Sequence, residues 1–198
     1  NFGFDPDADQ YHLINIGLWT PGKNQGEAVA WARELEAQQP GRFQFHFIGN
    51  QASNFEHYWG PLMQDLPANC HVHGERSDVE TFYHIADAVV FNSDWECNPL
   101  TIRQSLGWQL PVMARNLPQY HDMYTDALVE ITGNLTEDIT RLIQALEAPK
   151  PKRENEYTMA RFKKEHLDLY LNTINGPQKR SQSIEDIAIT WDSGPKVT

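Results

Sequence analysis

The residues best suited to chemistry lie in one stretch, 91–114, which reads FNSDWECNPLTIRQSLGWQLPVMA. A strand-like apolar segment there leads into a loop that holds Glu96, and a helix then begins around Pro99 to Thr101. Free backbone N–H groups and the helix dipole at such a beginning form a site for an anion such as a diphosphate. The Glu96 carboxylate would repel this anion if it pointed inward, so we expect it to accept hydrogen bonds from sugar hydroxyls. The alternative is a surface glutamate in a loop.

Alternating strands and helices must position this stretch. Apolar runs of strand length predict six strands, at 12–18, 43–49, 70–74, 87–93, 111–115 and 127–131. Segments with helical periodicity predict helices at 25–39, at 54–66, from Ser77-Asp78 onward, at 99–108 and at 135–148. Strands separated by helices pair in parallel through right-handed crossovers. The sequence therefore predicts an α/β fold, a Rossmann-like, doubly wound six-stranded parallel sheet with helices on both faces.

A ligand of such a sheet binds beyond the carboxyl ends of the strands. The segments that follow the first four predicted strands are therefore where we expect the site: 18–24, 49–54, 74–78 and 93–101. Neither GxGxxG after the first strand nor GxxxxGK[ST] occurs, which argues against dinucleotide oxidoreductases and P-loop nucleotidases.

Composition narrows the class of protein. The 198 residues are 40% hydrophobic and 22% charged, as in an ordinary globular domain. A formal charge of −11 argues against nucleic-acid binding and against direct contact of this part of the protein with an anionic membrane. Cys70 and Cys97 lack the spacing of a disulfide framework or a zinc site, so we expect two free thiols. Because there is no apolar run of the roughly 20 residues that span a bilayer and no signal-peptide pattern, we expect a cytoplasmic protein.

Two patterns could suggest a metal site. Asp5, Asp7 and Asp9 alternate before the first predicted strand, where a solvated linker is the better interpretation. His71 and His73 share one face of a strand, but the spacing offers no third ligand, so we interpret them as structural. The sequence therefore predicts no metal.

Residues 91–114 resemble family 4 of the retaining glycosyltransferases, which have the two-domain GT-B fold. The family has a Ser shortly before a Glu, a second Glu after seven further residues, and then Pro-Val. The matching positions here are Ser93, Glu96, Gln104 and Pro111-Val112. Two further motifs match in order, Ile16-Gly17 followed by Pro21 and Lys23, and Gly74 followed by Asp78. The resemblance covers residues 1 to about 148.

The resemblance implies binding of a nucleotide-diphospho-sugar. In the family, the lysine matching Lys23 neutralises the leaving diphosphate and the glutamate matching Glu96 contacts the donor sugar, so these two are predicted to be catalytic. The second glutamate, here Gln104, binds the ribose hydroxyls. The residues predicted to bind the donor are Gly17, Trp19, Gly49, Gly74, Arg76, Asn98, Pro99, Leu100, Thr101 and Gln104. In this set the backbone at 100–101 caps the phosphates, and Trp19 lies where a base or sugar could stack. No metal or other cofactor is expected; the nucleotide sugar is itself the substrate.

Two positions depart from the family pattern. Leu18 stands where the family usually has an Arg, which removes one of two cations on the leaving group. Gln104 can still hydrogen-bond a ribose diol but lacks the charge-assisted strength of a glutamate. Arg76, after the third strand, is a candidate substitute for the missing cation. These departures leave two alternatives open, a non-catalytic nucleotide-sugar-binding module and a sugar-nucleotide epimerase of the same fold.

The expected organisation is one nucleotide-sugar-binding domain with flanking segments. We predict an interdomain linker remnant at 1–10, the Rossmann-like domain at 11–148, a connector and helix at 149–175 and a tail at 176–198. In this interpretation the chain is the C-terminal, donor-binding half of a GT-B fold, and its partner is an N-terminal acceptor-binding domain. The intact protein would be a hexosyltransferase-like enzyme, and the chain alone would transfer no sugar.

Overall fold

The computed structural model describes residues 9–124 and 127–149. They belong to one compact unit, Asn1–Asn155. Most of the predicted linker at 1–10, nearly all of the predicted connector and helix at 149–175, and the tail at 176–198 lie outside the described residues.

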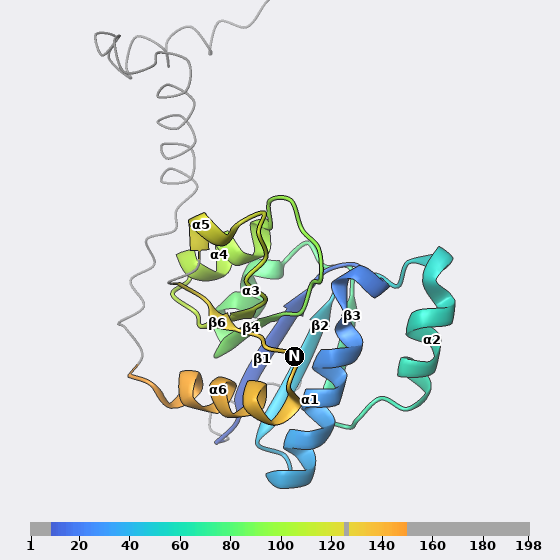
Figure 1. Ribbon diagram of the computed structural model, residues 1–198. Coiled ribbons are helices and arrows are strands. Elements are labelled where there is room, and N and C mark those ends of the chain that lie inside the picture. Colours follow the sequence, from blue (N-terminus) through green and yellow to red (C-terminus); the bar gives the residue numbers. More distant parts are fainter. Residues whose placement is uncertain (1–8, 125–126, 150–198) are drawn as a thin grey trace, which may run out of the picture. The chain divides into compact units, whose positions relative to one another are not determined.

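The described residues form one six-stranded sheet in the order β3-β2-β1-β4-β5-β6, with every neighbouring pair parallel (Figure 1). The strands are β1 (Tyr11–Ile16), β2 (Phe43–Ile48), β3 (Cys70–Gly74), β4 (Ala88–Phe91), β5 (Val112–Ala114) and β6 (Val129–Glu130). This order confirms the predicted doubly wound sheet. The chain builds outward from β1 to β3 and then returns to place β4 on the other side of β1. The carboxyl ends of β1 and β4 therefore flank the point where the strand order reverses, at which sheets of this kind bind their ligands.

Helices follow the strands as predicted, with ends shifted by a few residues. They are α1 (Gln25–Gln38), α2 (Glu56–Gln64), α3 (Val79–Ile85), α4 (Leu100–Gly107) and α6 (Leu135–Glu147). The structure adds α5 (His121–Tyr124) and the short 3-10 helices η1 (Pro21–Lys23) and η2 (Ser53–Phe55), which were not predicted. The strand predicted at 127–131 is reduced to the two residues of β6. Such differences are expected, because the last residues of an element have the fewest backbone partners.

Helices cover both faces of the sheet, and alternate strand residues serve the two faces. On one face, where α1 and α6 lie next to each other (Figure 1), Leu13 packs in one buried cluster with Trp31 of α1 and Leu142 of α6. Its neighbour Ile14 belongs to the opposite cluster, with Phe82 of α3. Burial on both faces explains why the inner strands β4 and β5 are continuously apolar.

Candidate functional site

Lys23 and Glu96, the two predicted catalytic residues, form an ion pair at the carboxyl edge of the sheet. Lys23 ends η1 just after β1, and Glu96 lies in the loop after β4; the lysine Nζ donates to Glu96 Oε1. The two side chains are 33% and 13% exposed. Lys23 Nζ also lies 5.6 Å from the centre of the Phe91 ring, within range of a cation–π contact. The two residues meet because β1 and β4 are neighbours in the sheet.

Three predicted glycines end the first three strands, and their backbones are in contact. Gly17 N donates to Ile48 O at 2.9 Å, and Gly49 N donates to Gly74 O at 2.7 Å. Gly49 has a φ of 139°, and a Cβ there would lie 2.1 Å from the carbonyl oxygen of Gly17. Position 49 therefore requires glycine, because the two backbones approach too closely for a side chain. Gly17 lies beside Lys23, since a Cβ at 17 would lie 3.6 Å from Lys23 Cδ.

Helix α4 begins one residue later than predicted. Pro99 is its N-cap with an extended backbone, φ −73° and ψ 100°, and Leu100 is its first helical residue. Pro99 is buried, whereas Leu100 is 54% exposed. Proline has no side-chain oxygen with which to cap the first turn, and its side chain makes no capping bond. The backbone N–H groups of Leu100 and Thr101 are thus left without a side-chain cap from Pro99, which is compatible with their predicted role toward a phosphate.

Gln104 lies on the exposed side of α4, four residues after Leu100. Its Oε1 accepts a hydrogen bond from the hydroxyl of buried Tyr83 at 3.3 Å. Burial raises the pKa of Tyr83 to about 12, so its hydroxyl keeps its proton near neutral pH and remains a donor. Asn98, in the loop before α4, is exposed.

The prediction that Trp19 stacks on a base or sugar is wrong. Its side chain is fully buried, with its ring centre 4.9 Å from that of Phe47. Backbone pairing continues past the end of β1, because Trp19 N donates to Asn50 O at 2.9 Å, and the alternation of strand side chains continues with it. Trp19 therefore joins the same buried cluster as Leu13, while Leu18 is 48% exposed.

Arg76, the predicted substitute cation, is held by Asp78. Its Nε and Nη2 donate to the two carboxylate oxygens, each at 2.8 Å, and this contact lowers the pKa of Asp78. Asp78 is the N-cap residue of α3 but makes no capping bond, because its carboxylate faces Arg76. Arg76 follows β3, whereas Lys23 follows β1. The strand β2 lies between β3 and β1 in the sheet.

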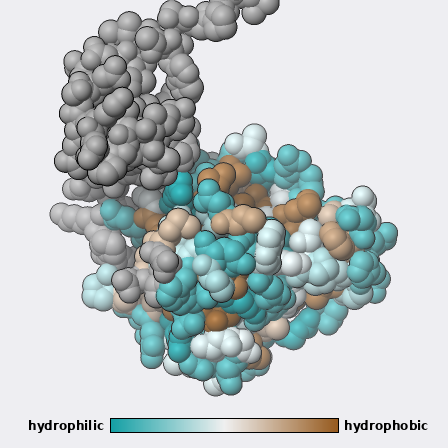
Figure 2. All heavy atoms as spheres, turned by 45° about the horizontal axis from the view of Figure 1, so that its top comes forward, coloured by the Kyte–Doolittle hydropathy of each residue, from teal (hydrophilic) through white to brown (hydrophobic). Residues whose placement is uncertain are grey.

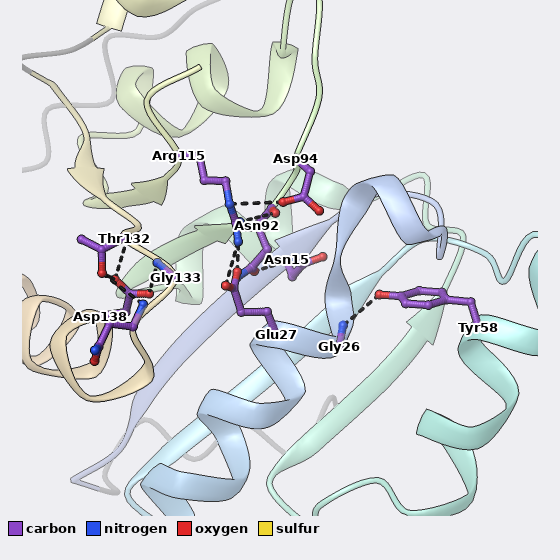
Figure 3. Close-up of polar contacts among 11 residues, drawn as sticks. Asn15, Gly26, Glu27, Tyr58, Asn92, Asp94, Arg115, Thr132, Gly133 and Asp138 are labelled. Atoms are coloured by element: carbon purple, nitrogen blue, oxygen red, sulfur yellow. Dashed lines mark hydrogen bonds and ion pairs between the residues drawn. The ribbon is translucent and has the colours of Figure 1, made fainter. Parts of the chain in front are cut away.

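A polar cluster that the sequence did not reveal lies at the same edge of the sheet. Arg115, which follows β5, pairs with Glu27 of α1 and with Asp94 of the loop after β4 (Figure 3). Asn92 Nδ2 donates to Glu27 Oε2 at 2.7 Å, and Asn15 Nδ2 lies 3.4 Å from Asn92 Oδ1. The available signal in the sequence for this cluster was a polar residue at or near the carboxyl end of each of three strands, namely Asn15 in β1, Asn92 after β4 and Arg115 after β5.

Tyr120 packs next to this cluster. Its hydroxyl donates to the carbonyl oxygen of Arg115 at 2.5 Å. Burial raises the pKa of Tyr120 to about 12, with a further increase from the Glu96 carboxylate and an opposing effect of Arg115. Tyr120 itself is 1% exposed, so this hydroxyl is held inside the domain.

Four histidines, His12, His46, His71 and His73, pack together on the first three strands near Phe82 of α3. His46 lies at the centre, with its Nε2 2.9 Å from His12 Nδ1 and its Nδ1 3.0 Å from His73 Nε2. Burial lowers the pKa of all four, that of His46 to about 3. Neutral imidazoles offer one donor and one acceptor each, which suits these ring-to-ring contacts. Within residues 9–124 and 127–149 no group of three or more metal-ligating side chains is arranged to hold an ion.

The outer surface near this edge is mixed in character. Leu18, Trp95 and Leu100, three of the exposed large apolar side chains, belong to the segments that follow β1 and β4, and Trp95 is 65% exposed. On the face shown in Figure 2, apolar atoms form small patches between hydrophilic ones. None of the helices in the described part of the chain has the length and apolar character to cross a bilayer.

The fold and these residues define a doubly wound α/β domain with a charged site at its switch point. The sequence profile of the family described as glycosyl transferases group 1 matches residues 3–161. The chain belongs to this family. Among curated protein sequences, none matches the chain significantly.

Solved structures of glycosyltransferases share the fold. WaaG, a glycosyltransferase involved in lipopolysaccharide biosynthesis, matches 70% of this chain with a TM-score of 0.59 and 17% identity. TarM of S. aureus matches 86% with a TM-score of 0.62 and 18% identity, and the trehalose-6-phosphate synthase OtsA matches 73% with a TM-score of 0.60 and 11% identity. The chain spans 38% of the length of each of these three proteins. Such coverage is consistent with the predicted half of a GT-B fold.

Proposed function

We propose that the chain binds the donor substrate, a nucleotide-diphospho-sugar, for retaining glycosyl transfer. The observation that carries this proposal is the Lys23–Glu96 ion pair at the carboxyl ends of β1 and β4, in a loop that leads into α4. A lysine and the N–H groups of a helix N-terminus suit a diphosphate, and a carboxylate suits sugar hydroxyls. Membership of the glycosyl transferases group 1 family supports the enzyme class.

Binding of a diphosphate requires an exchange of partners at Lys23. Glu96 is the ion-pair partner of this lysine, and in this group of residues three carboxylates, of Glu27, Asp94 and Glu96, pair with two cations, Lys23 and Arg115. A diphosphate that approached without displacing a carboxylate would meet net negative charge. The incoming diphosphate therefore replaces Glu96 at Lys23, and the released carboxylate accepts hydrogen bonds from the sugar hydroxyls.

Catalysis would then rest on positioning and electrostatics. The bond from the anomeric carbon to the diphosphate oxygen breaks, a bond to an acceptor oxygen forms on the same face of the sugar, and the proton of the acceptor hydroxyl passes to the released diphosphate oxygen. Lys23 and the α4 N-terminus stabilise the negative charge that develops on the diphosphate. An N-terminal domain of the intact protein would hold the acceptor and exclude water. The 198-residue chain should accordingly bind nucleotide but transfer no sugar.

The nucleoside part of the donor is proposed to lie along α4. By the resemblance, the Gln104 amide binds the ribose diol and the backbone of Leu100 and Thr101 binds the phosphates. The solved TarM structure contains UDP and alpha-GlcNAc-glycerol, which supports testing nucleoside diphosphates first. We also propose that the intact protein transfers a hexose and that it acts in the cytoplasm.

A non-catalytic sugar-nucleotide-binding module is the second candidate. The apolar, 48% exposed Leu18 stands where the family has a cation, and the Arg76 guanidinium is engaged by Asp78. A single lysine would then face the leaving group. This candidate predicts that the intact protein binds the nucleotide sugar and neither transfers nor hydrolyses it.

A thermal-shift screen of the chain against nucleosides, nucleoside diphosphates and their sugar conjugates tests the proposal. At 100 times its dissociation constant a ligand should stabilise the folded state by about 2.7 kcal/mol. We expect at least one diphosphate to raise the melting temperature more than its nucleoside does. A screen in which no diphosphate or conjugate has any effect would contradict donor binding.

A further inference from the structure

Arg115 contacts both segments that carry the Lys23–Glu96 pair. Its Nη1 and Nη2 donate to the two carboxylate oxygens of Glu27 at 3.0 and 2.8 Å, and its Nε lies 3.2 Å from Asp94 Oδ1. Glu27 is four residues after Lys23, and Asp94 is two residues before Glu96. One guanidinium at the end of β5 thus bridges the beginning of α1 and the loop after β4.

Backbone hydrogen bonds reinforce the bridge. Arg115 Nη1 also donates to the carbonyl oxygen of Asn92 at 2.6 Å, which holds the chain where the loop leaves β4. Asp94 N donates to the carbonyl oxygen of Gly22 at 3.0 Å, and Gly22 is the residue before Lys23. The loop with Glu96 and the turn with Lys23 are therefore joined directly as well as through Arg115.

The engagement of Arg115 favours a clamp over direct ligand binding. Its side chain is 21% exposed and that of Glu27 is 17% exposed, so their paired hydrogen bonds lie largely out of water, where charge-assisted bonds are strong. Four of its five N–H groups already face partners, Glu27 twice, Asn92 O once and Asp94 once, and two of these three partner groups are carboxylates. A phosphate at the guanidinium would have to compete with both carboxylates.

We propose that Arg115 is a positioning residue, which sets the relative placement of Lys23 and Glu96 by clamping Glu27 and Asp94. The role rests on the proposed function, because it matters for binding only if the pair receives a diphosphate. A purely structural arginine would contribute to stability alone. If Arg115 is a positioning residue, breaking only its contact with Asp94 should change the loop around Glu96. The free energy of unfolding of the domain should stay the same.

Asp94→Asn tests the clamp at its exposed side. Asp94 is 53% exposed, so its loss should leave the fold intact, whereas Arg115→Gln would leave the largely buried Glu27 carboxylate without its cation and could unfold the domain. The control is Asp65→Asn, which breaks the exposed Arg33–Asp65 pair of similar length, 3.0 Å, elsewhere in the domain. Asp94→Glu keeps a carboxylate and should behave like the parent chain.

Two measurements are made on the 198-residue chain. The first is fluorine NMR of chains labelled with 5-fluorotryptophan. Trp95 lies between Asp94 and Glu96, so its signal, assigned through Trp95→Phe, reports on the loop directly. The signal of buried Trp31 serves as internal reference. Calorimetric titration with UDP, GDP and ADP in turn reports on the site. Asp94→Asn should move or broaden the Trp95 signal alone and raise the dissociation constant of the bound diphosphate roughly fivefold.

The outcomes separate this inference from the proposed function. A change in the Trp95 signal with Asp94→Asn but not with Asp65→Asn or Asp94→Glu supports the clamp, even if no nucleotide binds the parent chain and donor binding fails. Unchanged Trp95 signals and unchanged nucleotide affinity in Asp94→Asn would overturn the positioning role while leaving donor binding intact. Equal changes in Asp94→Asn and Asp65→Asn would also overturn it, because they would reflect charge alone.

Discussion

Lys23 and Glu96 are 73 residues apart in the sequence, and the lysine ammonium donates directly to the glutamate carboxylate. They meet because the two segments that carry them leave neighbouring parallel strands at the same edge of the sheet. A diphosphate must therefore compete with Glu96 for Lys23, and a sugar hydroxyl must compete with Lys23 for Glu96. Replacing Glu96 should therefore raise the affinity for a plain diphosphate, and replacing Lys23 should lower it.

Glu96→Gln should tighten binding of a plain nucleoside diphosphate. The neutral amide no longer competes for Lys23, and a partly exposed ion pair of this kind is worth about 1 kcal/mol at most, so the gain should be up to roughly fivefold. The sugar conjugate should gain less, because an amide accepts hydrogen bonds from hydroxyls less strongly than a carboxylate does. Calorimetric titrations with both ligands measure the difference, with partly exposed Glu34→Gln of α1 as the control. Weaker binding of the plain diphosphate would contradict the exchange at Lys23.

Gln104→Glu should tighten binding of ribonucleotides. The Tyr83 hydroxyl can donate to a carboxylate as it does to the amide oxygen, so the side chain keeps its support. A charge-assisted bond to the ribose diol should add about 1 kcal/mol. Deoxyribonucleotides, which lack the 2′-hydroxyl, should gain less. A variant that binds both sugars no better than the parent chain would remove Gln104 from the site.

Gly49→Ala should strongly destabilise the domain. A methyl group would lie 2.1 Å from the carbonyl oxygen of Gly17, and φ is 139°. We expect a loss of about 3 kcal/mol or more in the free energy of unfolding, measured with urea. Gly60→Ala, within α2, is the matched control and should leave stability unchanged or raise it by up to about 1 kcal/mol. Equal stability of the two variants would show that the strand ends are not packed this closely.

Acidification should destabilise the domain through the histidine cluster. Burial lowers the pKa of His46 to about 3 in the folded chain, whereas an unfolded histidine titrates near 6.5. Between these values the unfolded state binds a proton that folded His46 does not, so stability is fully present above about pH 6.5 and falls as the pH drops, by about 1.4 kcal/mol per pH unit for this group. The lowered pKa values of His12, His71 and His73 act in the same direction.

Urea denaturation at about pH 7.5 and about pH 5 measures this dependence. His46→Gln should reduce the loss of stability between the two conditions, and His57→Asn, at an exposed position, should not. An identical pH dependence in His46→Gln and the parent chain would show that His46 is not held neutral by burial.

The order of the elements and the meeting of Lys23 with Glu96 were predictable, because periodicity locates strands and parallel strands end at one edge. The burial of Trp19 was missed, because pairing with Asn50 extends three residues past the end of β1; the alternation Leu13, Asn15, Gly17, Trp19 was the available signal. The position of Arg115 relative to Glu27, 88 residues away, was not predictable from local pattern. Such a contact depends on the tilt and spacing of three strands, which the sequence does not encode locally.

The most direct measurement of the central claim is calorimetric titration of Lys23→Ala with a nucleoside diphosphate and with the matching nucleoside. Lys23 addresses only the phosphates, so the diphosphate should lose about tenfold or more in affinity, as for a hydrogen bond to a charged group, while the nucleoside should be almost unaffected. Arg33→Ala removes a positive charge from the exposed side of α1 and should change neither. Equal losses for nucleoside and diphosphate in Lys23→Ala, or no loss for either, would contradict a diphosphate site at the Lys23–Glu96 pair.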